Sequence, residues 1–315
     1  MRNFSKKNLA LAIPVLMMGI GFSACNDDPA PIVPDANIVE VAAANPNFTT
    51  LVSAVQTAGL TPTLTGPGPF TVFAPTNEGF NRFLTDNNQT AEELLASNAL
   101  ETVLTYHVIG AEVPASAVAP GRVNTVAGAP FFVSVAPDNS IWINGSAQVV
   151  QTDVTASNGI IHVLDYVIVP PTQNIAQIAI ASSEAATPEF THLVAALIRA
   201  DLASAVSGGI DDDLTVFAPT DAAFEALFTA LGVTSVNEIP LETLTNVLLY
   251  HVVPARAFSQ DLRNGATLPT LLENATLSVD LNNLRINDSG LVESGLNIHA
   301  TNGVIHVIDT VLLPE

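Results

Sequence analysis

The sequence predicts an α+β fold that is built twice, as two domains in tandem. Three phrases occur twice at one separation: Thr71–Thr76 and Thr215–Thr220 (215 − 71 = 144), Tyr106–Val108 and Tyr250–Val252, and Asn158–Asp165 and Asn302–Asp309. In each copy helical patterns come first and strand patterns follow, which is typical of α+β proteins. A period this long exceeds the roughly 20–50 residues of solenoid and propeller repeats, so each copy is large enough to bury its own core.

The first part of each copy is predicted to be helical. Apolar residues at i, i+3, i+4 and i+7 mark an amphipathic helix: Phe48, Leu51, Val52 and Val55 in the first copy, and Phe190, Leu193, Val194 and Leu197 in the second. These positions are 142 apart, so the second copy has two extra residues before its next phrase. We expect these two extra residues to lie in the acidic, glycine-containing segment Ser207–Asp213.

A short strand and further helices follow. Thr71–Phe73 and Thr215–Phe217 are expected strands that end at Pro75 and Pro219. Thr76 and Thr220 then stand where helix N-caps belong. Thr90 and Glu93 predict a capping box for one helix that runs from Leu94 to Leu104, and Pro240 opens the equivalent helix.

The last part of each copy is predicted to be a sheet. Candidate strands are Val126, Phe131–Val135, Ile141–Ile143 and Gln148–Val150, and then Leu277–Leu281, Leu284–Ile286 and Leu296–His299. Each copy ends in a longer strand, Ile160–Val169 or Val304–Leu313, that is apolar on both faces and therefore central. The Asn-Gly pairs before these strands predict turns, since both residues tolerate positive φ.

The first 24 residues predict a signal peptide. Arg2, Lys6 and Lys7 precede the apolar run Leu9–Phe22, which is shorter than the roughly 20 residues of a membrane span. Phe22–Cys25 resembles a bacterial lipobox, which implies lipidation of Cys25, the only cysteine in the chain. An ordinary secretory signal is the alternative. Residues 25–36 are expected to be a proline-rich acidic linker. Its Asn26-Asp27-Asp28 resembles the surface-export signal of Bacteroidetes lipoproteins.

The predicted mature chain is strongly acidic. Without Arg2, Lys6 and Lys7 it has six arginines, no lysine and 30 acidic residues, a net charge of 6 − 30 = −24. Such a surface repels phosphate backbones, which argues against nucleic-acid binding. It equally disfavours adsorption to anionic lipid headgroups.

The repeated phrases, in this order, resemble the conserved blocks of the fasciclin-like domain. The resemblance covers nearly everything after Asn37, and it implies a β-sandwich or wedge flanked by helices, usually extracellular and active in adhesion. We therefore expect fasciclin-like domains at 37–171 and 172–315. In animal members the Tyr-His element is associated with receptor binding, which makes Tyr106, His107, Tyr250 and His251 possible partner-binding residues. The alternative is that tyrosine packs in the core and histidine bonds to the backbone.

No catalytic residue, metal site or cofactor is predicted. His162 and Asp165, like His306 and Asp309, are three positions apart, and such residues on a strand point to opposite faces. No nucleophile recurs beside them. The histidines form no closely spaced ligand cluster, and Asp211–Asp213 lacks the spacing of an EF-hand. A solvated loop is the favoured interpretation of that run.

These expectations combine into a function. The chain is predicted to be a non-catalytic outer-membrane lipoprotein, surface-exposed or else facing the periplasm. It would bind a surface polysaccharide, matrix or an envelope protein, and two tethered modules would raise its avidity. The alternatives are an envelope carrier of a small apolar ligand, and a hydrolase or transferase that uses the His/Asp pairs. Residues that the copies do not share, in Ser207–Asp213 or from Ala111 to Val123, are the favoured places for specificity.

Overall fold

The computed structural model describes residues 36–314, which belong to one compact unit, Pro34–Glu315. Cys25, the expected signal peptide and nearly all of the expected linker lie outside the described residues. We refer to residues 37–171 as domain 1 and to residues 172–314 as domain 2. None of the helices in the described part of the chain is both long and apolar enough to cross a membrane.

Domain 1 combines helices with a sheet. Its α-helices are Ile38–Ala44 (α1), Thr49–Thr57 (α2), Thr61–Leu64 (α3), Asn77–Asp86 (α4), Ala91–Leu95 (α5) and Leu100–Tyr106 (α6). Its strands are Phe70–Pro75 (β1), Val108–Ile109 (β2), Gly121–Asn124 (β3), Pro130–Val135 (β4), Ile141–Ile143 (β5), Ala147–Ala156 (β6) and Gly159–Leu164 (β7).

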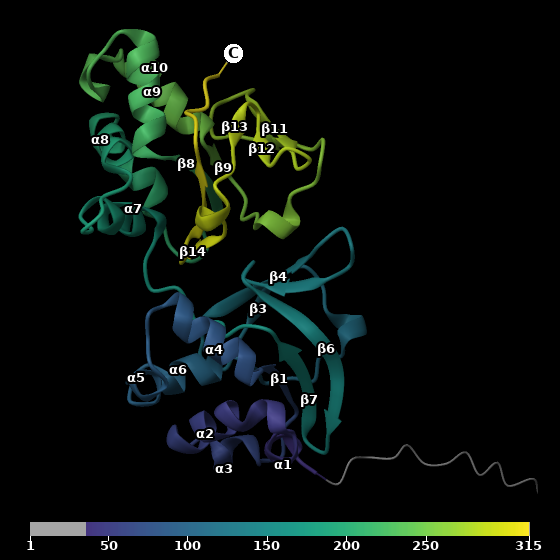
Figure 1. Ribbon diagram of the computed structural model, residues 1–315. Coiled ribbons are helices and arrows are strands. Elements are labelled where there is room, and N and C mark those ends of the chain that lie inside the picture. The colour runs from purple at the N-terminus through teal and green to yellow at the C-terminus, as the bar shows by residue number, and fades with distance from the viewer. Residues whose placement is uncertain (1–35, 315) are drawn as a thin grey trace, which may run out of the picture. The chain divides into compact units, whose positions relative to one another are not determined.

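Domain 2 repeats this order. Its α-helices are Ile175–Ser183 (α7), Thr191–Arg199 (α8), Asp221–Leu231 (α9) and Leu241–Tyr250 (α10). Its strands are Leu214–Pro219 (β8), Val252–Val253 (β9), Thr267–Pro269 (β10), Thr276–Asp280 (β11), Arg285–Ile286 (β12), Ser289–Gly290 (β13), Ile298–Ala300 (β14) and Gly303–Ile308 (β15). In each domain the helices lie to one side of the strands (Figure 1), so the predicted α+β class is confirmed.

In both domains the last strand is central. Domain 1 has the strand order β2-β1-β7-β6-β5-β4-β3, and domain 2 has the sheets β14-β15-β8-β9 and β10-β11-β12-β13. The last strand pairs in parallel with the first long strand, β7 with β1 and β15 with β8. All six residues of β7 and of β15 are buried, which confirms the expected central position.

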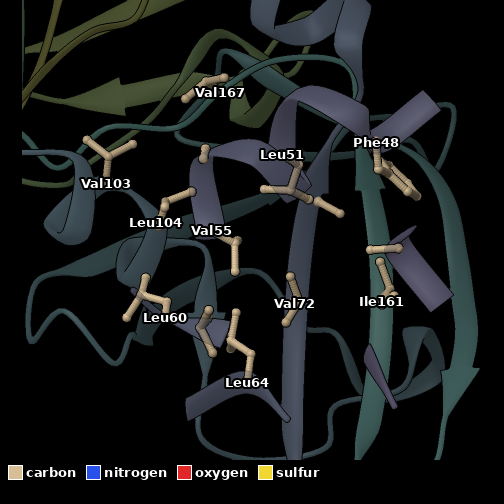
Figure 2. Packing of buried hydrophobic residues seen from close by; sticks show 14 of the residues in the cluster. Phe48, Leu51, Val55, Leu60, Leu64, Val72, Val103, Leu104, Ile161 and Val167 are labelled. Atoms are coloured by element: carbon tan, nitrogen blue, oxygen red, sulfur yellow. The ribbon is translucent and has the colours of Figure 1, made fainter. Parts of the chain in front are cut away.

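Each parallel pair separates two apolar layers. Val72 of β1 and Ile161 of β7 face the helices and pack with Phe48, Leu51, Val55, Val103 and Val167 (Figure 2). Phe73 and Leu164 face the other way, onto Tyr106, Phe131 and Ile143. Domain 2 repeats the alternation, with Val216 and Ile305 toward the helices and Phe217 and Ile308 away from them. Alternation with period two therefore places a buried strand pair between helices and the remaining strands.

The predicted turns at the Asn-Gly pairs are confirmed, since Ser157–Asn158 and Thr301–Asn302 connect antiparallel strands, and the glycines have a further role. A Cβ on Gly159 would lie 2.0 Å from the Phe70 carbonyl oxygen, and one on Gly303 would lie 2.2 Å from that of Leu214. The glycines thus allow the parallel strands to start side by side. The Asn158 carboxamide accepts a bond from the Ile38 N–H at 2.9 Å and donates to the Leu64 carbonyl at 2.8 Å. It therefore ties α1 and α3 to the sheet.

Some predicted elements were wrong in length or continuity. The final strands end at Leu164 and Ile308, because the chain then leaves the ladder although Val167 and Ile168 remain buried. The expected helix from Leu94 to Leu104 is two helices, α5 and α6. Val126 lies outside the strands and is half exposed.

The predicted helix starts agree better with the structure. Thr76 and Thr220 cap α4 and α9 by accepting from the Gly79 and Ala223 N–H groups. Thr90 and Glu93 form the predicted capping box. The helices α1 and α7, which precede the predicted ones, were not anticipated.

Candidate functional site: the repeated polar residues and the domain junction

The Tyr-His residues are buried in both domains. Tyr106 and His107 are 0% and 2% exposed, and Tyr250 and His251 are 5% and 3% exposed. The Tyr106 hydroxyl donates to the Pro130 carbonyl at 2.9 Å and accepts from Asn144 Nδ2 at 3.1 Å. Tyr250 makes the same bonds with Thr276 and Asn287. Each tyrosine thereby joins a helix end to one strand and to the turn that contains the asparagine.

Each histidine of this pair fastens the end of its domain. Nδ1 of His107 donates to the Val103 carbonyl at 2.7 Å, and Nε2 accepts from the Ile168 N–H at 3.1 Å. His251 bonds equally to Val247 and Leu312, at 2.7 and 3.0 Å. Burial lowers the pKa of both rings to about 4, so they are neutral at pH 7.

The interpretation that tyrosine packs in the core and histidine bonds to the backbone is therefore correct. Contact of Tyr106, His107, Tyr250 or His251 with a partner stays a prediction. In this structure their polar atoms are engaged inside the domain.

The His/Asp pairs do not share a hydrogen bond. Nε2 of His162 donates to the Val113 carbonyl at 2.9 Å. Asp165 follows the strand, where it accepts from the Gln148 N–H at 2.7 Å and pairs with Arg82 at 3.3 Å. His306 and Asp309 are separated in the same way. His306 donates to the Ala257 carbonyl, and Asp309 accepts from the Gly290 N–H. The direct contact that a catalytic dyad needs is missing from these pairs.

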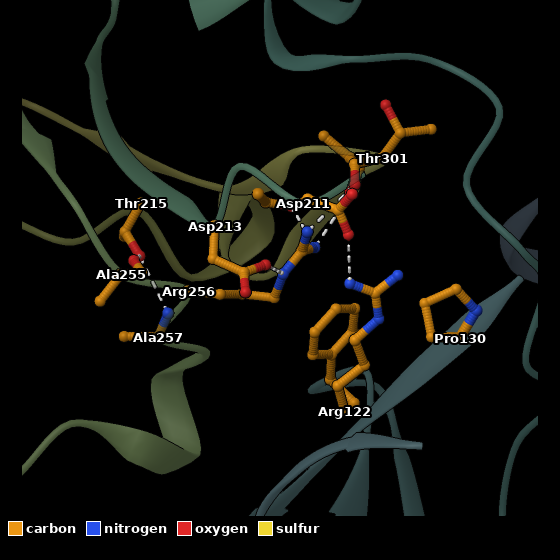
Figure 3. Close-up of polar contacts among 12 residues, drawn as sticks. Arg122, Pro130, Asp211, Asp213, Thr215, Ala255, Arg256, Ala257 and Thr301 are labelled. Atoms are coloured by element: carbon orange, nitrogen blue, oxygen red, sulfur yellow. Dashed lines mark hydrogen bonds and ion pairs between the residues drawn. The ribbon is translucent and has the colours of Figure 1, made fainter. Parts of the chain in front are cut away.

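The acidic segment Ser207–Asp213 contributes to ion pairs. Asp211 accepts from Arg122 at 2.8 Å, and Asp213 accepts from Nε of Arg256 at 2.9 Å (Figure 3). Within residues 36–314, no three His, Cys, Asp or Glu side chains are grouped closely enough to hold a metal ion.

Arg256 lies at a junction between the domains. Its guanidinium donates to the carbonyls of Ala300, Thr301 and Gly303 at 2.8–3.1 Å. The same group stacks on the ring of Phe132 from domain 1, with its central carbon 4.0 Å from the ring centroid. Phe132 also packs with Phe258 and Val304 of domain 2. A buried cation over an aromatic ring is a strong form of this contact.

Polar bonds surround this apolar centre. Besides the pair between Arg122 and Asp211, Ser134 donates to Asp261 at 2.9 Å. Arg263 donates to the Val135 carbonyl at 2.8 Å. Burial raises the pKa of Asp261, against the opposing effect of the Ser134 bond.

Gly145 of domain 1 packs directly against domain 2. Its carbonyl accepts from Gln260 Nε2 at 3.1 Å and from Asn297 Nδ2 at 2.9 Å. A Cβ at this position would lie 2.6 Å from a ring carbon of Phe258 and 2.8 Å from Cγ of Asn297. Its φ of +66° also favours glycine.

His299 lies partly buried at the junction, and its Nε2 atom is buried without a hydrogen-bond partner among residues 36–314. The ring meets Phe132 and Phe258 edge to face, at centroid distances of 5.9 and 5.5 Å. No group in the described part of the chain bonds to its Nε2. Burial, and then the charge of Arg256, lower its pKa to about 3.

Sequence reasoning missed the junction as a unit. Its partners come from segments with no shared motif, and pairing across domains leaves no local pattern. Two segments that the sequence singled out do meet there, since Arg122 lies in the stretch from Ala111 to Val123 and Asp211 lies in Ser207–Asp213. His299 has no histidine counterpart 144 positions earlier, where Thr155 stands, and this difference is the signal that could have pointed to the junction.

Each domain also has a small apolar cavity beneath its first helix. The cavities measure about 30 and about 20 Å³, and equivalent residues line them, including His107 in one and His251 in the other. About 10–15 Å³ is the space of one water molecule. Neither cavity is therefore a pocket for an apolar ligand in this structure.

We expect acid to destabilise the protein between pH 6.5 and 4. His107, His251 and His306 have pKa values of about 4 when folded, and His299 about 3, against about 6.5 when unfolded. The unfolded chain alone takes up these protons, so stability is full above pH 6.5 and falls toward pH 4. Each ring contributes up to about 1.4 kcal/mol per pH unit.

Urea unfolding at pH 7 and pH 5 measures this loss, and imidazole ¹⁵N shifts report the charge of each ring. Equal unfolding free energies at both pH values, with rings that titrate near pH 6.5, would contradict it.

We expect Gly145→Ala to uncouple the domains. The added methyl group clashes with Phe258, and residue 145 also keeps its positive φ. Gly59→Ala is the matched control, because Gly59 has a φ of +69° and nothing within 4 Å of its Cβ position. The left-handed conformation costs both variants about 1–2 kcal/mol.

Backbone ¹⁵N relaxation gives the rotational correlation time of each domain. In Gly145→Ala the domains should tumble faster than in Gly59→Ala. Identical correlation times in the two variants would show that the junction does not depend on this contact.

Comparisons with known proteins agree with the repeated fold. The Fasciclin domain model matches residues 46–170 and 188–314. Protein sll1483 of Synechocystis is 45% identical over 137 residues, which cover 42% of this chain and 73% of that protein. Transforming growth factor-beta-induced protein ig-h3 of Sus scrofa is 29% identical over 292 residues, 90% of this chain and 40% of that protein.

Two further proteins are similar to this chain. Periostin of Homo sapiens is 28% identical over 260 residues, and this chain spans 29% of its length. A solved FAS1 domain pair from the insect cell adhesion molecule fasciclin I shares 18% identity, with a TM-score of 0.37 over 87% of this chain and 95% of that one. Because the family model covers most of both halves, the chain belongs to the fasciclin domain family, with two such domains in tandem.

Proposed function

We propose that this protein is a non-catalytic adhesion module that presents two fasciclin domains as a joined pair. The main observation behind the proposal is that the repeated polar residues make their hydrogen bonds inside the domains. The tyrosines and histidines of the shared phrases bond inside each domain, so duplication preserves a scaffold and not a reaction centre. Membership of the fasciclin domain family supports the same class of function.

The proposed location is the bacterial envelope. The charged head, the apolar run and Cys25 support export followed by lipid attachment, with surface exposure as the first expectation and a periplasm-facing orientation as the second. Acyl chains at Cys25 would hold the compact unit at the outer membrane through the segment that precedes Asn37.

The proposed partners are a surface polysaccharide, matrix material or an envelope protein. The formal net charge of −21 excludes polyanions as favourable partners, because they would be repelled at physiological salt. Two modules on one chain raise avidity where both can engage one surface.

We expect the compact unit Pro34–Glu315 to bind a neutral glycan or a cell surface, and each separated domain to bind at least tenfold more weakly. Glycan arrays and whole-cell binding assays measure this. Each domain has its own apolar clusters, so circular dichroism can verify that the separated halves are folded. No binding to any glycan or cell would overturn the adhesion proposal.

We expect Cys25→Ser to move the full-length protein from the membrane fraction to the soluble exported fraction. The substitution removes the only thiol in the chain and with it the acylation site. Incorporation of radiolabelled palmitate should be lost in parallel. Protease added to intact cells then separates surface exposure from a periplasmic orientation. A Cys25→Ser protein that still incorporates palmitate or sediments with membranes would refute lipidation.

A further inference from the structure

Domain 1 contacts domain 2 through a face that contains Phe132 and Gly145. Domain 2 has a structurally equivalent face of its own. The Tyr-Asn hydrogen bonds identify equivalent positions in the two copies. Asn144 donates to the Tyr106 hydroxyl, and Asn287 donates to the Tyr250 hydroxyl. The same Asn side chains accept from the backbone N–H of Phe132 and of Ser278, at 2.8 and 2.7 Å. Ser278 is therefore the counterpart of Phe132. Asp288, which follows Asn287, is the counterpart of Gly145.

These counterparts differ in the properties that the junction needs. Phe132 is buried against Phe258 and Arg256, whereas Ser278 is exposed. Gly145 has no room for a Cβ, whereas its counterpart is an exposed aspartate. A further fasciclin domain docked on domain 2 as domain 2 docks on domain 1 would lose the aromatic contact and clash with Asp288. The face on domain 2 is thus changed for a different occupant.

An open groove lies on this face. Its volume is about 930 Å³, within the range of ligand sites. The lining residues include the hydroxyl-bearing Thr267, Thr276 and Ser278, the acidic Glu273 and Asp288, and the apolar Leu272 and Leu313. The described lining contains no lysine, arginine or histidine. The two carboxylates have no hydrogen bond or ion pair to any described side chain, and both residues are exposed.

We propose that this groove binds a segment of a neutral polysaccharide. Carboxylates accept hydrogen bonds from sugar hydroxyls, and such charge-assisted bonds are the strong kind. Leucine side chains offer apolar surface to the C–H faces of the sugar rings. An anionic glycan would meet two uncompensated carboxylates, so the charge of the groove favours neutral glycans over anionic ones. This inference rests on the proposed adhesion function and assigns one of its binding sites, that of the second module, to domain 2.

The test is ¹H–¹⁵N NMR titration of the compact unit Pro34–Glu315 with neutral tetrasaccharides of glucose, mannose, galactose and xylose. Tetragalacturonate and tetralysine serve as the anionic and cationic probes. We expect shifts from at least one neutral probe at Ser278, Asp288 and Leu313, and none from tetragalacturonate. The double variant Glu273→Gln/Asp288→Asn should bind about tenfold more weakly. Glu225→Gln, an exposed carboxylate within α9, is the matched control and should bind as the wild type does.

Two outcomes would overturn the groove assignment. Neutral probes that leave the groove residues unshifted would do so, and tetralysine that shifts them in the wild type but not in the double variant would assign the groove to basic peptides. Retained adhesion of the double variant to cells or glycans would disprove the groove while leaving the adhesion function intact. Absence of all adhesion in the wild type would instead refute the proposed function itself.

Discussion

The parallel pairing of the first long strand with the last strand is the constraint on which each domain depends. It brings residues about 90 positions apart, such as Phe70 and Gly159, into one register. The strands are buried on both faces, so their side chains must satisfy a helical layer and a sheet layer at once. The absence of a side chain on Gly159 and Gly303 permits this approach.

The buried polar groups follow from that arrangement. A strand pair buried on both sides leaves neighbouring backbone groups away from water, and each must find a partner. His107 and His251 supply acceptors for the Ile168 and Leu312 N–H groups after the last strand has left its ladder. Asn158 and Asn302 do the same for the first helix of each domain, at Ile38 and Ile175. Because these roles are internal, they recur unchanged in both copies.

The two domains differ in the face that domain 1 uses to contact domain 2. Phe132 and Gly145 contact domain 2, where the guanidinium of Arg256 lies over the Phe132 ring. Domain 2 does not offer this contact a second time, since Ser278 and Asp288 stand at the equivalent positions. Duplication therefore produced one scaffold with two surface chemistries. On domain 2, the face equivalent to the apolar junction face of domain 1 has hydroxyl-bearing and acidic residues along its groove.

Much of the scaffold could be read from the sequence because its signals are local or repeated. The 144-residue separation of the repeated phrases indicated two copies of one domain. The positions of Thr76 and Thr220 predicted two helix caps, and strands that are apolar on both faces predicted that the last strand of each domain is central in its sheet. Strand ends could not be read, because Val167 and Ile168 are as apolar in an irregular segment as in a strand. The junction and the groove were decided only by the tertiary structure. They are assembled from residues such as Arg122 and Asp211, whose pairing depends on where separate elements meet in space.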